Sequence, residues 1–269
     1  MASVFCVANQ KGGVGKTTTS VNLAAGLARI GQRVLLVDLD PQGNATMGSG
    51  VDKRQLRPSV YQALLGIATL SEARRPSPQG GYDVLGANRE LAGAEVELVD
   101  QDRREHRLKD LLAEVADDYD FVLVDTPPAL GLLTLNALCA ARGVIVPMQC
   151  EYFALEGLTD LVNTVRQVHA KLNPELVLIG LLRVMFDPRI TLQQQVSEQL
   201  KTHFGNKVFD AVIPRNVRLA EAPSYGLPGV VFDRASRGAQ AYVEFADELV
   251  RRVGPQAHAS AANARTTTA

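Results

Sequence analysis

Three glycines and two lysines stand within eight residues near the N-terminus, and residues of these types at this spacing suit phosphate chemistry. The segment reads Lys11-Gly12-Gly13-Val14-Gly15-Lys16-Thr17-Thr18. Glycines let backbone N–H groups turn toward a polyphosphate, and the start of a following helix adds partial positive charge. In such a loop Lys16 would reach the β- and γ-phosphates, and the Thr17 hydroxyl would bind Mg²⁺. We therefore predict that all eight residues line a nucleotide site.

The loop departs from the common pattern G-x4-G-K-[S/T]. Its end, Gly15-Lys16-Thr17, fits, but position 10 is Gln10 and the loop carries an additional lysine, Lys11. One lysine already contacts the phosphates within the chain, so a second on the outer edge could reach a nucleotide held by another subunit. There it would stabilise charge on the transferred phosphoryl group, as an arginine finger does. The alternative is a solvated surface lysine, and the sequence leaves both open.

Two apolar runs end in aspartates. Asp38 and Asp40 close the run that includes Val37, and Asp125 closes another. Ligands bind outside the carboxyl ends of strands in open α/β sheets, so these carboxylates are expected near the phosphates. Asp125 is the expected magnesium carboxylate, holding the ion through water. Asp40 is assigned to the metal site too, and is the better candidate to position or activate the attacking water. Asp38 could instead belong to the metal shell, and each aspartate could alternatively cap a turn.

The elements that position these groups alternate between strand and helix. A strand at 4–8, the glycine loop, a helix at 17–30 and a strand at 33–39 form a βαβ unit, which predicts a parallel sheet with helices on both faces. Further strands are expected at 82–85, 119–124, 144–148, 176–184 and 211–213. Further helices are expected at 60–65, 91–115, 130–141, 155–172, 192–204, 217–221 and 239–253.

This alternation predicts a single doubly wound α/β domain over residues 1–253, with a mostly parallel central sheet flanked by helices. The segment 254–269 is rich in Ala, Ser and Thr and is expected to be a disordered tail. The remainder of 47–81 contains several prolines and glycines and is expected to be loop.

Composition restricts the function further. The 269 residues carry a formal net charge of −1, so any nucleic-acid binding needs a local patch. The three cysteines form no CxxC pair, which disfavours a disulfide framework or a zinc site. No apolar run is long enough to cross a bilayer, and no signal peptide is recognisable. A cytoplasmic ATP-hydrolysing protein is the prediction.

With these motifs together, the sequence resembles the ParA/Soj family of DNA-segregation ATPases, within the MinD-like group of P-loop proteins that have a deviant Walker A loop. The resemblance extends from Val4 to about Val253. An especially characteristic stretch reads Ile213-Pro214-Arg215-Asn216-Val217-Arg218-Leu219, followed by Glu221-Ala222-Pro223.

The resemblance implies a slow ATPase that uses ATP and Mg²⁺ and forms an ATP-dependent sandwich homodimer. Lys11 would act across the interface, with Gly12 packed against the partner copy. Asp40 would support hydrolysis, and Pro214, Arg215 and Asn216 would lie beside the adenine. A ParB-like centromere-binding protein would stimulate hydrolysis and so release the dimer from DNA.

The resemblance also implies that the dimer binds double-stranded DNA non-specifically through Arg189 and Arg218, which would place it on the nucleoid. Arginines suit phosphate contacts because they are always charged and can bond bidentately. Four arginines are further candidates for this surface: Arg183, Arg215, Arg234 and Arg237.

Two features of the chain ends bear on the partners. The phosphate loop begins at residue 11, so no helix-turn-helix domain is expected before it, and the tail after Gly254 lacks the basic amphipathic helix of a membrane anchor. The alternative function is a MinD-like positioning ATPase that acts on a membrane or a protein cargo without DNA.

Overall fold

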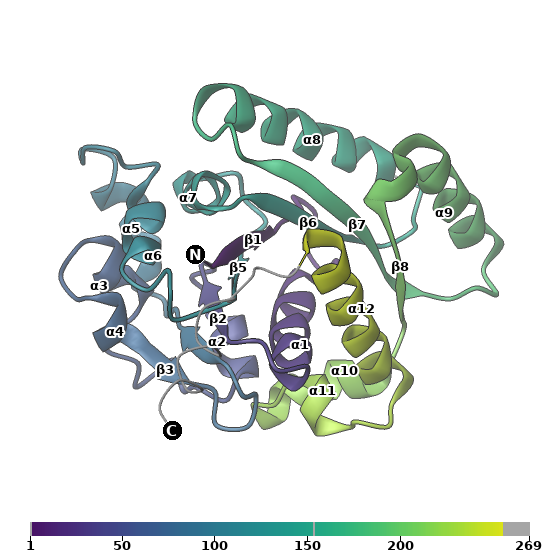
Figure 1. Ribbon diagram of the computed structural model, residues 1–269, viewed down its shortest axis with the longest axis horizontal. Coiled ribbons are helices and arrows are strands. Elements are labelled where there is room, and N and C mark those ends of the chain that lie inside the picture. Colours follow the sequence, from purple (N-terminus) through teal and green to yellow (C-terminus); the bar gives the residue numbers. More distant parts are fainter. Residues whose placement is uncertain (1, 153, 255–269) are drawn as a thin grey trace, which may run out of the picture.

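A twisted eight-stranded sheet forms the centre of this computed structural model, which describes residues 2–152 and 154–254 (Figure 1). The strand order is β3-β4-β2-β5-β1-β6-β7-β8, and every neighbouring pair is parallel except β3 with β4. The strands are β1 (Ser3–Val7), β2 (Val34–Asp38), β3 (Arg74–Pro76), β4 (Asp83–Leu85), β5 (Phe121–Asp125), β6 (Gly143–Met148), β7 (Val177–Phe186) and β8 (Val208–Pro214).

Helices cover both faces of the sheet (Figure 1). One layer contains α1 (Lys16–Arg29), α2 (Asn44–Gly48), α10 (Val217–Glu221), η2 (Ala222–Tyr225), α11 (Gly229–Phe232) and α12 (Arg237–Val253). On the other side, or at the sheet's ends, lie α3 (Val60–Leu64), α4 (Leu70–Ala73), α5 (Leu91–Glu97), α6 (Arg107–Ala113), α7 (Leu132–Ala140), α8 (Ala154–Lys171), α9 (Thr191–Phe204) and η1 (Gly205–Lys207). The single doubly wound α/β domain predicted from the sequence is confirmed.

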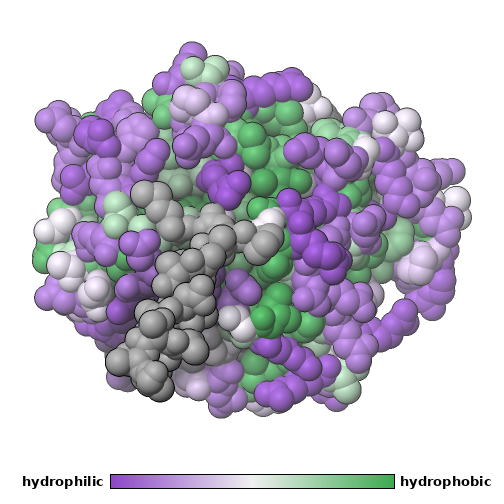
Figure 2. Space-filling view, viewed as in Figure 1, coloured by the Kyte–Doolittle hydropathy of each residue, from purple (hydrophilic) through white to green (hydrophobic). Residues whose placement is uncertain are grey.

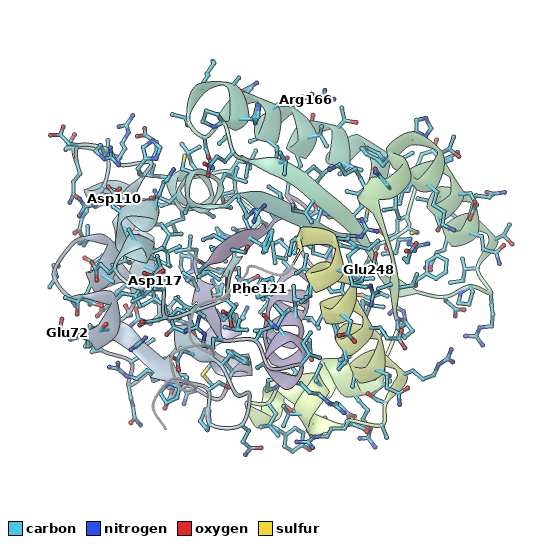
Figure 3. All side chains as sticks on the ribbon, in the orientation of Figure 1. Glu72, Asp110, Asp117, Phe121, Arg166 and Glu248 are labelled. Carbon is cyan, nitrogen blue, oxygen red and sulfur yellow. The ribbon has the colours of Figure 1, made fainter. Side chains whose placement is uncertain are left out.

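The central strands are apolar because both of their faces are buried. Along β1, Phe5 packs with the α1 and α12 side of the core, while Cys6 packs with the α7 and α8 side, and both are fully buried. Each large apolar side chain so buried contributes about 1.5–3 kcal/mol to folding. Figure 3 places Phe121 at the centre of the molecule and Glu72, Asp110 and Asp117 toward its rim. In Figure 2, hydrophilic residues dominate the outer helices at both sides of this view.

The parallel register brings three strand ends to one place. Asp125 is aligned with Val7 of β1 and with Asp38 of β2. The glycine loop follows β1 directly, and α1 begins within it at Lys16. The carboxyl ends of β1, β2 and β5 therefore gather the loop and the aspartates, as expected from the sequence.

The main differences from the predicted elements lie between residues 47 and 115. β3 was not predicted, because it has three residues, includes Pro76 and forms the antiparallel edge, so it has no apolar alternation to recognise. The helix expected at 91–115 is interrupted, with turns between α5 and α6. The tail expected at 254–269 lies outside the described residues, apart from Gly254. No helix among the described residues is long and apolar enough to cross a membrane.

Candidate nucleotide site

Two glycines of the loop adopt backbone conformations that side chains disfavour. Gly13 has φ 73° and Gly15 has φ 79°, both left-handed, and Gly15 is the N-cap of α1. Gly12 is different: a Cβ there would meet no described atom within 4 Å, and its φ is not in the left-handed region. Nothing within the described chain therefore requires glycine at position 12.

Lys16 is held inside its own loop. Its side chain is largely buried, and Nζ donates to the carbonyl oxygen of Lys11 at 3.1 Å. Burial lowers the pKa of Lys16, while the negative charges of Asp125 and Asp40 act in the opposite direction. The Lys16 ammonium can therefore replace its hydrogen bond to this carbonyl oxygen with hydrogen bonds to phosphate oxygens.

Asp125 lies at the centre of the site and is fully buried. The Thr17 hydroxyl donates to Oδ2 and the Ser20 hydroxyl is placed to donate to Oδ1, both at 2.8 Å. Burial, followed by the charge of Asp38, raises the pKa of Asp125 to about 7. Thr17 and Asp125 supply hydroxyl and carboxylate oxygens, the donor set that suits Mg²⁺. No group of three or more His, Cys, Asp or Glu that could hold a metal occurs among the described residues, so phosphate oxygens or water would have to complete such a site.

Asp38, the neighbour of Asp125 on β2, anchors the loop that follows it. Oδ2 accepts from the Thr46 backbone N–H and hydroxyl, both at 2.8 Å, and Oδ1 accepts from the Asp40 N–H at 3.1 Å. The Thr46 hydroxyl oxygen in turn accepts from the Ala87 N–H. Burial raises the pKa of Asp38 to about 6 against these hydrogen bonds. Both carboxylate oxygens are engaged by the chain, so Asp38 holds the 40–46 loop in place.

Asp40 stands on that loop and is partly buried. Its Oδ1 accepts from the Gln42 N–H at 2.9 Å, which is the turn-capping contact considered as an alternative role. Its charge nevertheless acts on Lys16. Asp40 thus caps a turn, and its charge acts on the lysine of the glycine loop.

The predicted adenine residues lie beside the glycine loop. Pro214, Arg215 and Asn216, which follow or end β8, line a hollow of about 140 Å³ together with Gly15 and Thr18. Asn216 also caps α10 through its side chain, which accepts from the Leu219 N–H. The structure therefore brings these distant segments of the sequence to one side of the loop.

Lys11, in contrast to Lys16, points outward. Its Nζ pairs with Glu151 Oε2 at 2.5 Å, and both side chains are about half exposed. No role was predicted for Glu151, which follows β6. Ser20 was missed as well, although its place one helical turn after Lys16 was a usable signal.

The arginines expected at DNA lie apart from the buried network. Arg189 is exposed and ion-paired with Asp187, whose pKa this hydrogen-bonded arginine lowers to about 2. Arg218 is exposed too and pairs with Glu221 at 2.9 Å and with Asp233 at 3.4 Å. The suggestion that Arg183 joins them is wrong, because its side chain is buried and donates to Ser197 and to backbone carbonyls.

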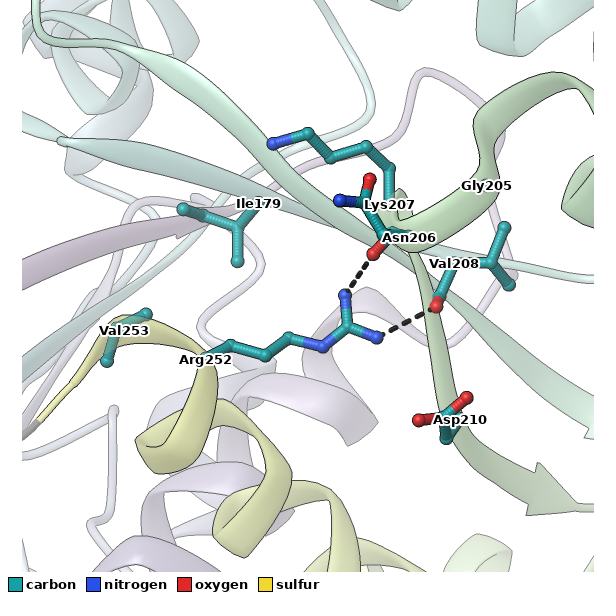
Figure 4. Close-up of a pocket in the computed structure, with 8 residues that line it drawn as sticks. All are labelled: Ile179, Gly205, Asn206, Lys207, Val208, Asp210, Arg252 and Val253. Atoms are coloured by element: carbon teal, nitrogen blue, oxygen red, sulfur yellow. Dashed lines mark hydrogen bonds between the residues drawn. The ribbon is translucent and has the colours of Figure 1, made fainter.

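A second hollow, of about 500 Å³, lies beside the amino end of β8, the last strand of the sheet (Figure 4). There Arg252 of α12 donates to the carbonyl oxygens of Asn206 and Val208, where β8 begins. Ligands of open α/β sheets bind at the carboxyl ends of strands, so this hollow at an amino end is not the nucleotide site.

Comparison with known proteins agrees with this geometry. A family model described as an AAA domain matches residues 2–178. The sporulation initiation inhibitor protein Soj of Bacillus subtilis (strain 168) is 51% identical over 249 residues, which are 93% of this chain and 98% of that protein. The chromosome partitioning protein ParA of Myxococcus xanthus (strain DK1622) is 48% identical over 253 residues, 94% of this chain and 89% of that protein.

A similar solved structure is the crystal structure of cobyrinic acid a,c-diamide synthase from Mycobacterium smegmatis with bound ADP and magnesium. Its TM-score is 0.84 and its identity 42%, covering 94% of this chain and 96% of that chain. The likeness thus extends over nearly the whole described fold and includes a structure with a nucleotide and a metal ion.

Proposed function

Because the chain belongs to the ParA/Soj family of chromosome-partitioning P-loop ATPases, we propose that ATP binding pairs two copies of it and that the pair binds DNA non-specifically until hydrolysis releases it. The contrast between the two lysines of the glycine loop carries the proposal. Lys16 is buried and turned into its own loop, whereas Lys11 is half exposed and turned away from it. This contrast supports a role for Lys16 at the chain's own nucleotide and a role for Lys11 at the nucleotide of a second copy.

ATP and Mg²⁺ would be held by the residues gathered at the strand ends. The loop N–H groups and Lys16 bind the β- and γ-phosphates, and the hollow beside Pro214, Arg215 and Asn216 accepts the adenine. Thr17 and Asp125 would hold Mg²⁺, and Asp40 is proposed to belong to the same metal site. When bound, Mg²⁺ neutralises charge that develops on the phosphate oxygens. A similar structure, 42% identical, was solved with ADP and magnesium, which supports this assignment.

Hydrolysis requires a water molecule in line with the γ-phosphorus. Asp40 orients that water, whose oxygen bonds to phosphorus as the bond to the β-phosphate oxygen breaks; one proton of the water passes to an oxygen of the transferred phosphoryl group, and ADP and phosphate leave. The Asp38 and Thr46 contacts fix the loop that carries Asp40. Lys16 in the same chain and Lys11 of a second copy stabilise the charge on the transferred group. Hydrolysis is slow until a ParB-like protein stimulates it.

The dimer face is proposed to include Gly12. Nothing in the described chain requires glycine at this position, so the need for a small residue would come from outside the chain. A valine at position 12 would then block pairing while leaving the single chain folded.

DNA would be bound by exposed arginines. Arg189 and Arg218 are the main candidates, and Arg215, Arg234 and Arg237 add to the surface. Arg215 lies near Asp187, since its charge contributes to the lowered pKa of that carboxyl, and Arg237 lines a hollow with Pro188. The segments that carry Arg189, Arg215 and Arg237 thus lie near one another around the ends of β7 and β8. Residues 1–253 form the ATPase unit in this proposal, and the protein acts in the cytoplasm on the nucleoid.

The test is retention of the protein on an immobilised random-sequence DNA duplex with ATP, with ADP and without nucleotide. We expect retention with ATP only, decreasing steeply as salt rises because phosphate contacts release counterions. Vesicles of anionic phosphatidylglycerol provide the parallel surface. Retention on vesicles instead of DNA would favour the MinD-like alternative, and no ATP-dependent retention on DNA would contradict the proposed function.

A further inference from the structure

The segment that follows β6 runs along the outer edge of the glycine loop. β6 pairs with β1 in parallel, so both strands end at the same edge of the sheet. Asn9 Nδ2 donates to the Pro147 carbonyl oxygen at 2.9 Å, and Lys11 Nζ pairs with Glu151 Oε2 at 2.5 Å. The first contact joins the loop to the end of β6, and the second brings Glu151 against Lys11.

Lys11 has a defined place in the single chain as a result. Glu151 is the one acidic partner found for the Lys11 ammonium within the described residues, and the loop N–H of Lys11 is held by the Asn9 side chain at 2.9 Å. The contact with Asn9 thus positions the Lys11 backbone, and the contact with Glu151 positions the Lys11 ammonium.

The pair is weak enough to open. Both side chains are about half exposed, and an exposed pair of this kind shifts an equilibrium by about 1.5- to 5-fold. It therefore cannot lock the chain, but it can reduce the fraction of chains whose Lys11 is available at any moment by that factor.

We propose that Glu151 is a positioning residue for Lys11, which it holds on its own subunit until a second copy binds. This inference rests on the proposed role of Lys11 at the nucleotide of the other copy. To reach that nucleotide, Lys11 must leave Glu151. The departure also leaves the Glu151 carboxylate without Lys11, so contacts made by the dimer have to compensate for the lost pair.

The charges of Glu151 and of the nucleotide phosphates explain how the Lys11–Glu151 pair would make dimerisation depend on ATP. Without nucleotide, no phosphate competes with Glu151 for the Lys11 ammonium. Dimerisation is then disfavoured because Lys11 stays paired with Glu151. With ATP on both copies, the phosphates of the second copy attract Lys11 more strongly than one exposed carboxylate does. The same side chain thus has two partners whose relative strength depends on the nucleotide.

The first experiment measures the contact itself in the nucleotide-free chain. An amine-acylating reagent should modify Lys11 about 1.5 to 5 times faster in Glu151→Gln than in the parent, because the carboxylate no longer holds the ammonium; mass spectrometry of the peptides gives the rate. Glu198→Gln is the matched control, since Glu198 pairs with Lys201 at 3.2 Å with both side chains at least half exposed. That control should speed the labelling of Lys201 and leave Lys11 unchanged.

The second experiment measures the consequence. With a slowly hydrolysed ATP analogue, light scattering should show that Glu151→Gln dimerises about 2 to 25 times more tightly than the parent, because both Lys11 side chains of the dimer must leave their Glu151 and the single-chain factor enters twice. The difference should shrink near 1 M salt, where the screening length is only about 3 Å. Glu198→Gln should dimerise as the parent does.

The outcomes separate this inference from the proposed function. Unchanged Lys11 labelling, or dimerisation that is unchanged or weaker in Glu151→Gln, would overturn the role of Glu151. A parent protein that stays a single chain with the ATP analogue would instead contradict the proposed function, whatever the labelling shows.

Discussion

The strand ends of β1, β2 and β5 and the surface segments that carry Arg189 and Arg218 present functional side chains in opposite ways. Asp38 and Asp125 are fully buried and engaged by hydroxyls and N–H groups of other elements. The Arg189 side chain is 88% exposed and is paired with a residue two positions away. The first region is held together by buried contacts between elements, and the second by exposed ion pairs.

This difference determines what a substitution should do in each region. In the buried network each group has partners on several elements, so removing one leaves another unsatisfied and affects both stability and chemistry. An exposed ion pair contributes little to stability, so a change on the arginine surface should alter binding alone, and in a salt-dependent manner. Substitutions in the two regions can therefore be told apart by whether they change unfolding.

The largest effect is expected for Lys16→Ala. This change removes the buried ammonium that would bond the β- and γ-phosphates, and charge-assisted hydrogen bonds contribute about 1.5–3 kcal/mol each. We expect at least about a 100-fold loss of ATP affinity in isothermal titration calorimetry. Lys11→Ala is the control, because its side chain faces away from its own nucleotide site, and it should keep single-chain ATP affinity. Equal losses in both variants would contradict the division of roles between the lysines.

Thr46→Val should come next, and it tests the buried network directly. Valine has nearly the shape of threonine but cannot donate to Asp38 or accept from the Ala87 N–H. Leaving buried groups unsatisfied costs about 1–3 kcal/mol each, so the urea midpoint of unfolding should fall clearly. Thr46→Ser keeps the hydroxyl and should retain most of the stability. If serine and valine are equally destabilising, the hydroxyl is not the anchor of the 40–46 loop.

Charge reversal on the arginine surface should have a smaller effect of a different kind. Arg189→Glu and Arg218→Glu should each weaken ATP-dependent DNA binding by about 10-fold at moderate salt and make it less salt-dependent. Stability and dimerisation should not change. Arg103→Glu is the matched control, since Arg103 is an exposed arginine paired with Asp110 outside the proposed surface. Unchanged DNA affinity would remove Arg189 or Arg218 from the surface.

Asp187→Asn should have the smallest effect and the opposite sign. The carboxylate competes with DNA phosphate for Arg189, so its loss should raise DNA affinity by about 2- to 5-fold. Because Arg189 lowers the folded-state pKa of Asp187 to about 2, below the unfolded value near 4, the pair is complete above about pH 4 and is lost as pH falls toward 2. The gain in affinity should therefore be constant between pH 6 and 8. A gain that varies within that range would mean that another group titrates at this surface.

Much of the nucleotide region was predictable from the sequence, because the physics there is local. The glycines beside Lys16 and Thr17 predict the phosphate loop, and the helical spacing after them predicts the helix. The apolar runs that end at Asp38 and Asp125 predict two buried strands, and the parallel register then aligns the ends of these strands. The resemblance to the ParA/Soj family added the segment 214–216, whereas Asp40 was already a candidate because it follows a strand end. The comparisons confirm the family.

What the sequence could not provide depends on contacts between distant segments. Glu151 lies 140 residues from Lys11, and only the pairing of β6 with β1 brings the two together. Arg183 was grouped with the exposed arginines because a guanidinium is usually exposed, but the packing of α9 and β8 encloses it. The short edge strand β3 was missed because its pairing with β4, and not its own residues, makes it a strand.

The mass of the Asp40→Ala variant in solution tests the central claim most directly. Light scattering should report a single chain without nucleotide and a dimer with ATP that persists for as long as ATP is present, and added random-sequence DNA should bind that dimer. The parent should form the dimer only transiently. An Asp40→Ala variant that stays a single chain with ATP, or that hydrolyses ATP at the parent's rate, would contradict the claim that nucleotide hydrolysis governs the pairing of two copies on DNA.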